Sequence, residues 1–204
     1  MRSFSYRADG LYCEDVRVAD VAEREGTPLY VYSRAELLWR LAQIETAFRD
    51  ADPLICYSVK ANGNLSILRL LAEKGCGFDV VSGGELFRTL RAGAGPGKVV
   101  FAGVGKTPRE IREALQAGIF QFNVESPSEL GSINRIAGDT GCRARAALRL
   151  NPDVDARTHA KTTTAKKETK FGIPLDEALD LFRDRASFAN VDINGVHLHL
   201  GSPI

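Results

Sequence analysis

Short apolar runs alternate with longer amphipathic stretches along this chain. Each apolar run is rich in β-branched and aromatic residues and is followed by polar turn residues, the pattern of a buried strand that leads into a helix. The runs that predict strands are Leu29 to Tyr32, Leu54 to Val59, Phe78 to Val81, Val99 to Ala102, Phe120 to Val124, Ala146 to Leu150 and Asn194 to Leu200. Strands and helices that alternate in this way predict βαβ crossovers and a parallel sheet with helices outside it.

Four of the predicted helices begin with the sequence of a capping box, in which a hydroxyl side chain at the helix start is answered by a glutamate three residues later. The pairs are Ser33 with Glu36, Ser82 with Glu85, Thr107 with Glu110 and Ser126 with Glu129. Pro108 and Pro127 then occupy the first helical position, where a missing N–H removes no hydrogen bond. The helix starts are therefore specified locally.

The two faces of the predicted strands differ in polarity, and this difference separates two kinds of parallel sheet. An open sheet covered by helices on both sides is apolar on both faces. Here one face carries small or polar residues and ends, at the carboxyl ends of the strands, in Lys60, Glu125, Arg149 and His199. Functional groups that converge at carboxyl ends are typical of a TIM barrel. The sequence therefore predicts an α/β fold of the (β/α)8 barrel type.

Composition narrows the classes of function. The 27 Lys and Arg residues against 26 Asp and Glu leave a net charge of +1, so charge gives no reason to expect nucleic acid or an anionic membrane as a partner. No apolar run approaches the roughly 18 residues of a membrane span, and residues 1–10 lack the apolar segment of a secretory signal. The four cysteines are scattered without metal-ligand spacing, which predicts reduced thiols in the cytoplasm.

Three further motifs do not fit the chemistry that they suggest. Gly103 to Thr107 (GVGKT) ends like a phosphate-binding loop, but position 100, where that loop needs its first glycine, is a valine. Gly93 to Gly97 follows a helix instead of a strand, the reverse of a dinucleotide-binding fingerprint. His197 and His199 form an H-x-H pair on which no further ligand converges, so we expect no metal site.

Lys60 gives the sequence its strongest chemical signal. It closes an apolar strand and is followed by Ala-Asn-Gly-Asn, a turn that ends the strand. At the mouth of a barrel we expect its ammonium to be partly desolvated, which favours the neutral amine that Schiff-base chemistry needs. For an isolated lysine, a side chain that simply reaches solvent from the strand end would be the better interpretation.

The surroundings of Lys60 resemble a known family in order and spacing. The matching segments are YSVKAN (57–62), NLSIL (64–68), FDVVSGGEL (78–86), FNVES (122–126), LRLNPD (148–153), KFG (170–172) and HLHLGS (197–202). Together they resemble the pyridoxal-phosphate barrel of the diaminopimelate decarboxylases, a barrel of the alanine-racemase type. The lysine motif is shared with alanine racemase and with ornithine and arginine decarboxylases, whereas TPLYVY (27–32) and FDVVSGGEL favour the diaminopimelate branch.

The resemblance implies the cofactor pyridoxal 5′-phosphate and a set of site residues. Lys60 would be the Schiff-base lysine and would assist proton transfer. His199 would stack on the pyridine ring; the alternative is a core histidine that is hydrogen-bonded inside the barrel. Ser202 would lie near the cofactor phosphate, and Asp79 and Arg149 would border the cofactor.

The function that the resemblance implies is that of an amino-acid decarboxylase, a lyase of lysine biosynthesis that converts meso-2,6-diaminopimelate to L-lysine. We expect a cytoplasmic homodimer that acts on a small amino-acid substrate, without nucleic-acid or membrane partners. Three alternatives stay open: a decarboxylase for ornithine, arginine or carboxynorspermidine, an alanine-racemase-like enzyme, and a non-catalytic regulatory barrel. The last of these predicts loss of the lysine or of its stacking partner, and both residues are present.

The predicted organisation is a lead-in strand region over residues 1–32, which in relatives packs with a C-terminal β-domain, and a partial barrel over residues 33–204. Six barrel strands can be counted from Leu54 to Leu200, and a barrel needs eight. We therefore expect the chain to be the front portion of a longer protein and to be inactive alone. The missing half would supply the glycine-rich phosphate loop and the substrate-binding residues.

Overall fold

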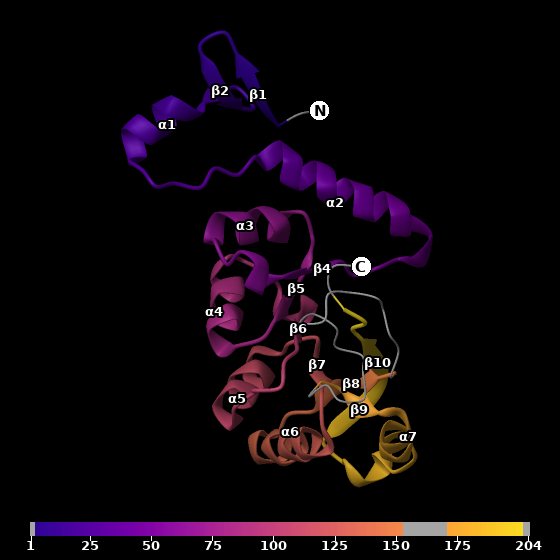
Figure 1. Ribbon diagram of the computed structural model, residues 1–204. Coiled ribbons are helices and arrows are strands. Elements are labelled where there is room, and N and C mark those ends of the chain that lie inside the picture. Colours follow the sequence, from indigo (N-terminus) through magenta and orange to yellow (C-terminus); the bar gives the residue numbers. More distant parts are fainter. Residues whose placement is uncertain (1–2, 153–170, 202–204) are drawn as a thin grey trace. The chain divides into compact units, whose positions relative to one another are not determined.

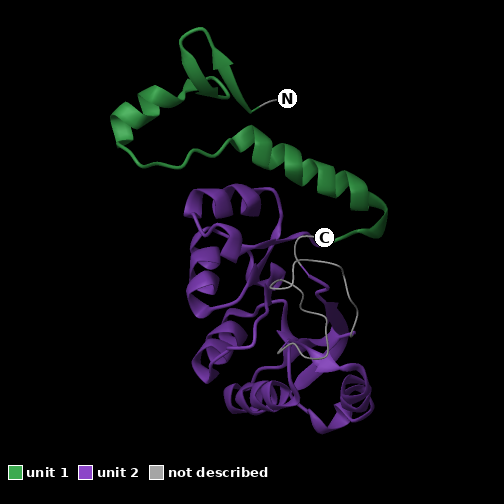
Figure 2. Cartoon of the chain, in the orientation of Figure 1, with its two compact units in different colours: residues 1–53 green, residues 54–204 purple. Residues whose placement is uncertain are grey.

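The computed structural model describes residues 3–152 and 171–201. Contacts within the chain divide it into two compact units, residues 1–53 and 54–204 (Figure 2). The boundary between the units therefore follows the helix that begins after Ser33. The sequence predicted a domain boundary between residues 32 and 33, and that boundary stays a prediction.

The first unit contains a small antiparallel sheet that the sequence patterns did not predict. Strands β1 (Phe4–Arg7), β2 (Gly10–Cys13) and β3 (Val16–Arg17) pair in that order and lead into helix α1 (Val18–Glu25). Helix α2 (Arg34–Phe48) and a short 3-10 turn (Arg49–Ala51) follow. The carboxylate of Glu14 accepts hydrogen bonds from Ser33 Oγ (2.7 Å) and from the Ala35 N–H (2.8 Å), so it ties the start of α2 to this sheet.

The strand predicted at Leu29 to Tyr32 is wrong. The structure has no strand at these residues, and within the described part of the chain no ladder pairs with them. Their β-branched and aromatic composition favours an extended backbone, but a strand needs a neighbour whose N–H and C=O groups it can share.

The second unit is built on a parallel sheet whose strands lie in chain order (Figure 1). The sheet contains β4 (Cys56–Ser58), β5 (Gly77–Val80), β6 (Val99–Phe101), β7 (Gln121–Val124), β8 (Ala144–Asn151) and β10 (Val191–Leu198), while the short β9 (Ile173–Pro174) pairs with β8. Every one of these pairings is parallel. A doubly wound sheet reverses its strand order at one point, and no reversal occurs among the described strands, which confirms the predicted barrel fold as an arc of six consecutive barrel strands.

Five helices connect these strands and pack against one face of the sheet. They are α3 (Leu65–Glu73), α4 (Gly83–Arg91), α5 (Pro108–Ala117), α6 (Pro127–Thr140) and α7 (Leu175–Arg183). The core lies between helices and strands, where Phe78, Phe101 and Phe122 are fully buried with Leu130 and Ile133. Because side chains alternate along a strand, the neighbouring positions face the inside of the arc.

The four predicted helix caps all form. In each case the hydroxyl at the helix start accepts a hydrogen bond from the backbone N–H of the glutamate three residues later. Only Thr107 and Glu110 complete the reciprocal capping box. In α4 and α6 the glutamate reaches one residue further back, because Glu85 accepts from the Val81 N–H and Glu129 accepts from the Glu125 N–H.

The described residues bear on two expectations from composition, the reduced cysteines and the lack of a membrane span. All four cysteines are free thiols. Among the helices of residues 3–152 and 171–201, none is both long and apolar enough to cross a membrane.

Candidate active site

Lys60 lies where β4 ends, in a 3-10 turn formed by Val59–Ala61. Val59 is buried and fixes this turn to the barrel, whereas Lys60 itself is exposed. Lys60 is thus exposed among the described residues, where the sequence analysis expected its ammonium to be partly desolvated. Its positive charge nevertheless acts on the Asp79 carboxyl and on the His199 imidazole.

Asp79 lies on the inner face of β5, beside β4. Its carboxylate accepts a hydrogen bond of 3.0 Å from Ser58 Oγ. Burial raises the pKa of the Asp79 carboxyl, and this rise is opposed by the Ser58 hydrogen bond and by the charges of Lys60, Arg149 and His199. The structure thus brings four of the five predicted site residues within electrostatic reach of one another.

Arg149 is a buried cation on the inner face of β8, and only 8% of the residue is exposed. Its Nη1 lies 2.8 Å from Oε1 of Glu125, the residue that directly follows β7. Its guanidinium carbon also lies 4.9 Å from the centre of the Phe171 ring. The pairing of Arg149 with Glu125 follows from strand register, because Val124 lies opposite Leu148 in the ladder.

Two histidines, one in β10 and one directly after it, continue the polar inner face. His197 lies opposite Arg149 in the pairing of β10 with β8. Burial, followed by the charge of Arg149, lowers the pKa of His197 to about 4. Burial and the charges of Arg149 and Lys60 also lower the pKa of His199 below 6.5. Near pH 7 the His197 ring is therefore uncharged, and burial favours the neutral form of His199 as well.

Lys106, which comes from the rejected GVGKT segment, is part of this inner region. Only 1% of its side chain is exposed, and its ammonium donates to Glu129 Oε1 at 2.6 Å and to the carbonyls of Gly103 and Asn123 at 2.8 Å each. The sequence analysis missed this role. The available signal was the pair of glutamates after β7, Glu125 and Glu129, which a nearby cation can balance.

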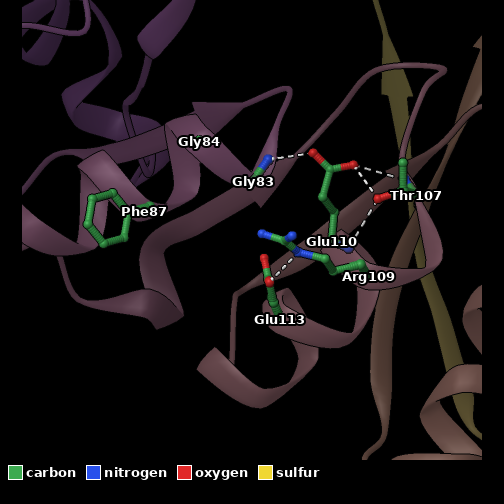
Figure 3. Close-up of a pocket in the computed structure, with 7 residues that line it drawn as sticks. All are labelled: Gly83, Gly84, Phe87, Thr107, Arg109, Glu110 and Glu113. Atoms are coloured by element: carbon green, nitrogen blue, oxygen red, sulfur yellow. Dashed lines mark hydrogen bonds and ion pairs between the residues drawn. The ribbon is translucent and has the colours of Figure 1, made fainter.

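A cavity of about 580 Å³ opens elsewhere, between the starts of α4 and α5 (Figure 3). There Glu110 accepts from the Gly83 N–H (2.7 Å) and from Thr107, while Arg109 pairs with Glu113 at 2.8 Å. These charged groups are paired with each other or with backbone. None of the predicted site residues lines this cavity, so we do not place the active site there.

The remaining predicted residue, Ser202, lies outside the described residues. His197 and His199 are the pair that could begin a metal site. Among residues 3–152 and 171–201, no three His, Cys, Asp or Glu side chains lie so that they could hold a metal ion together.

The inner face offers the groups that an anionic aromatic aldehyde needs. Lys60 supplies a primary amine, His199 a neutral flat ring, and Arg149 a cationic donor of hydrogen bonds. Two buried polar atoms, Glu125 Oε2 and His197 Nδ1, have no hydrogen-bond partner among the described residues. Buried polar atoms are nearly always paired, so these two indicate a face shaped to meet further polar groups. The residues present therefore fit a pyridoxal cofactor.

Comparison with known proteins agrees with this chemistry. The profile of the family described as "Pyridoxal-dependent decarboxylase, pyridoxal binding domain" matches residues 34–204, and the chain belongs to this family. Over its whole length the chain is 49% identical to the diaminopimelate decarboxylase of Vibrio cholerae, of which it covers 49%. It thus spans about half the length of the curated relatives that it matches.

Solved structures give the same result. The diaminopimelate decarboxylase of M. jannaschii in co-complex with L-lysine superposes with a TM-score of 0.91 at 36% identity, over 100% of this chain and 49% of that one. The Helicobacter pylori diaminopimelate decarboxylase complexed with L-lysine gives a TM-score of 0.89 at 41% identity, over 92% of this chain and 48% of that one. The likeness to these enzymes therefore extends to the arrangement of the barrel arc.

Proposed function

We propose that the protein decarboxylates meso-2,6-diaminopimelate to L-lysine with pyridoxal 5′-phosphate as its cofactor. The observation that carries this proposal is the 49% identity to a diaminopimelate decarboxylase along the entire chain. The polar inner face supports it independently, because it gathers an amine, two neutral imidazoles and a buried guanidinium. The proposal includes a cytoplasmic homodimer and a small amino-acid substrate.

Each residue has a defined task in this proposal. When bound, pyridoxal phosphate supplies an electron sink for the electron pair that departing CO2 leaves behind. Lys60 holds the cofactor covalently and, once released, is placed to carry a proton, for which an exposed and unpacked side chain has the necessary freedom.

The other four residues bind and orient. His199, whose neutral form is favoured by burial, would offer its flat face to the pyridine ring. Arg149 would donate to an anionic oxygen of the cofactor, and Asp79 would border the cofactor. For Ser202, which lies outside the described residues, the family resemblance implies a place near the cofactor phosphate.

The first experiment tests the cofactor and its attachment. The protein in its full natural length is incubated with pyridoxal phosphate, reduced with borohydride and digested, and the modified peptide is identified by mass spectrometry. We expect the label on Lys60 and its complete loss in Lys60→Ala. Lys74→Ala is the matched control, since Lys74 is also an exposed lysine close in sequence. A label that persists in Lys60→Ala contradicts the assignment.

The second experiment tests the substrate. Release of CO2 is measured with meso-diaminopimelate, ornithine, arginine and carboxynorspermidine at equal concentrations. We expect release from diaminopimelate with formation of L-lysine. Faster release from another amino acid would replace the substrate but keep the chemistry, and cofactor labelling without any release would favour the regulatory barrel.

A further inference from the structure

Four residues that follow the carboxyl ends of β6 and β7 form a closed ring of hydrogen bonds. The Gly103 N–H donates to Glu125 Oε1 at 3.0 Å, and the Gly103 carbonyl accepts from Lys106 Nζ at 2.8 Å. Lys106 Nζ also donates to Glu129 Oε1 at 2.6 Å, and Glu129 Oε2 accepts from the Glu125 N–H at 3.0 Å. The ring connects the loop after β6 with the end of β7 and the start of α6.

The ring holds Glu125 by its backbone and by its side chain. Its backbone N–H is held by Glu129, and its Oε1 is held by Gly103. Gly103 has a φ of 97°, in the left-handed region, so glycine suits the turn that aims this N–H at the carboxylate. Glu125 therefore presents a carboxylate of fixed orientation to β8.

Arg149 is the group that this carboxylate meets. The side chains of Arg149 and Glu125 are only 9% and 2% exposed, and the Nη1 to Oε1 distance is 2.8 Å. Phe171 lies against the guanidinium on another side, at 4.9 Å. In a buried site a charged hydrogen bond of this kind is short and directional, so the orientation of the guanidinium depends on Glu125.

We propose that Glu125 is a positioning residue, which acts through Arg149 to hold a hydrogen-bond donor toward an anionic oxygen of the ligand at the strand ends. This inference rests on the proposed function, since it takes pyridoxal phosphate as that ligand. It assigns no catalytic contact to Glu125 itself. In this proposal Lys106 and Gly103 complete the hydrogen-bonded ring that orients Glu125, and they do not bind phosphate.

The test measures binding of pyridoxal phosphate to the full-length protein freed of cofactor, by fluorescence titration and by the absorbance spectrum of the bound form. In Glu125→Gln the amide oxygen can still accept from Gly103, but the charge is lost and the new NH2 group takes the place of Oε2, which has no described partner. We expect affinity to fall about tenfold, because the amide oxygen that meets Arg149 carries no charge and its hydrogen bond to the guanidinium is weaker. Glu113→Gln is the control, because Glu113 pairs with Arg109 at the same 2.8 Å on an exposed helix, and we expect unchanged binding.

A double-mutant cycle separates positioning from a general structural effect. Arg149→Gln alone should weaken binding at least as much as Glu125→Gln, and Glu125→Gln in the Arg149→Gln background should add nothing further. Losses that add in the double variant overturn the proposal, because Glu125 would then act without Arg149. Wild-type affinity in either single variant overturns it as well.

Two further controls keep the result interpretable. If Glu125→Gln does not fold, as judged by circular dichroism, Glu125→Asp takes its place in the same cycle, since it keeps the charge but withdraws the carboxylate. If the wild-type protein binds no pyridoxal phosphate, the proposed function fails. If it binds and Glu125→Gln binds equally well, the positioning role alone fails.

Discussion

The ammonium of Lys106 lies 2.6 Å from the carboxylate of Glu129, and the two side chains are 1% and 11% exposed. With the carbonyls of Gly103 and Asn123, Glu129 provides Lys106 with three acceptors, which matches the three donors of an ammonium. This buried pair therefore joins a loop, a strand and a helix at one point.

The first prediction concerns the stability that depends on this pair. Lys106→Met removes one partner and leaves the Glu129 carboxylate buried without its counter-charge, which typically costs about 3–5 kcal/mol of unfolding free energy. Arg109→Met breaks the exposed Arg109–Glu113 pair of α5, and we expect a change of about 0.5 kcal/mol or less. Urea unfolding monitored by circular dichroism measures both. Equal effects would mean that burial of the Lys106 pair has no energetic consequence.

The second prediction concerns the close approach of backbone at Gly77, the first residue of β5. A Cβ atom there would come within 2.5 Å of the Lys98 carbonyl oxygen and 2.7 Å of Cys56 Sγ. We expect Gly77→Ala to destabilise the protein by about 1–3 kcal/mol through overpacking.

Gly95→Ala is the matched control, because a Cβ at Gly95 meets nothing within 4 Å and its φ is −68°. This change should be neutral or stabilise by about 0.4–1 kcal/mol through the unfolded state. Thermal unfolding of the two variants side by side gives the comparison, and a tolerated alanine at position 77 would contradict the contact.

The third prediction uses two serines of the same helix. Ser126 caps α6 by accepting the Glu129 N–H at 3.2 Å, whereas Ser132 lies within α6 and donates to the Ser128 carbonyl. Ser126→Ala should lower the unfolding free energy by about 1 kcal/mol, because an N–H at the helix start loses its acceptor. Ser132→Ala should be neutral or slightly stabilising, because alanine is the better helix former. The reverse order of stabilities would argue against the cap.

The fourth prediction concerns pH and His197. Its pKa is lowered from 6.5 to about 4 by burial, so the unfolded chain binds a proton in this interval that the folded chain does not bind. The contribution of His197 to stability is therefore fully present above pH 6.5 and is lost as the pH falls toward 4. We expect the unfolding free energy of His197→Gln to fall less steeply over this interval than that of the wild type. Parallel curves for the two proteins would contradict a buried neutral imidazole.

The barrel arc could be predicted from the sequence because its signals are local and agree with each other. Each of the six predicted barrel strands from Leu54 onward overlaps an observed strand, and the hydroxyl caps at Ser82, Thr107 and Ser126 all form. The antiparallel sheet of residues 4–17 escaped prediction, since its strands have only four, four and two residues. Conversely, the extended run at Leu29 to Tyr32 had strand composition but no partner, which composition alone does not reveal.

The sequence predicted which residues lie on the inner face, but not which of them form ion pairs with each other. Alternation along the strands placed Arg149, Glu125 and His199 on one face, and the structure has Arg149 and Glu125 in contact. The ion pair itself depends on the relative register of β7 and β8, which no single strand encodes. Lys60 likewise lies in a 3-10 turn after β4, where the pattern suggested a straight strand.

Lys106 has a structural role that its motif, GVGKT, does not indicate. Its glycines and hydroxyl neighbour resemble part of a phosphate loop, yet its ammonium is fully used by protein acceptors. The acceptors come from the loop itself, from β7 and from α6, so only the folded chain reveals their convergence.

The glutamates near the starts of α4 and α6 have a consequence for how such a barrel can change during evolution. Glu85 and Glu129 each hold the backbone N–H of the residue that directly follows a strand, Val81 in one case and Glu125 in the other. Because the held group belongs to the backbone, the same turn accepts either side chain. Natural variation can therefore install or remove a functional group at the end of a strand while the turn and its helix are inherited unchanged.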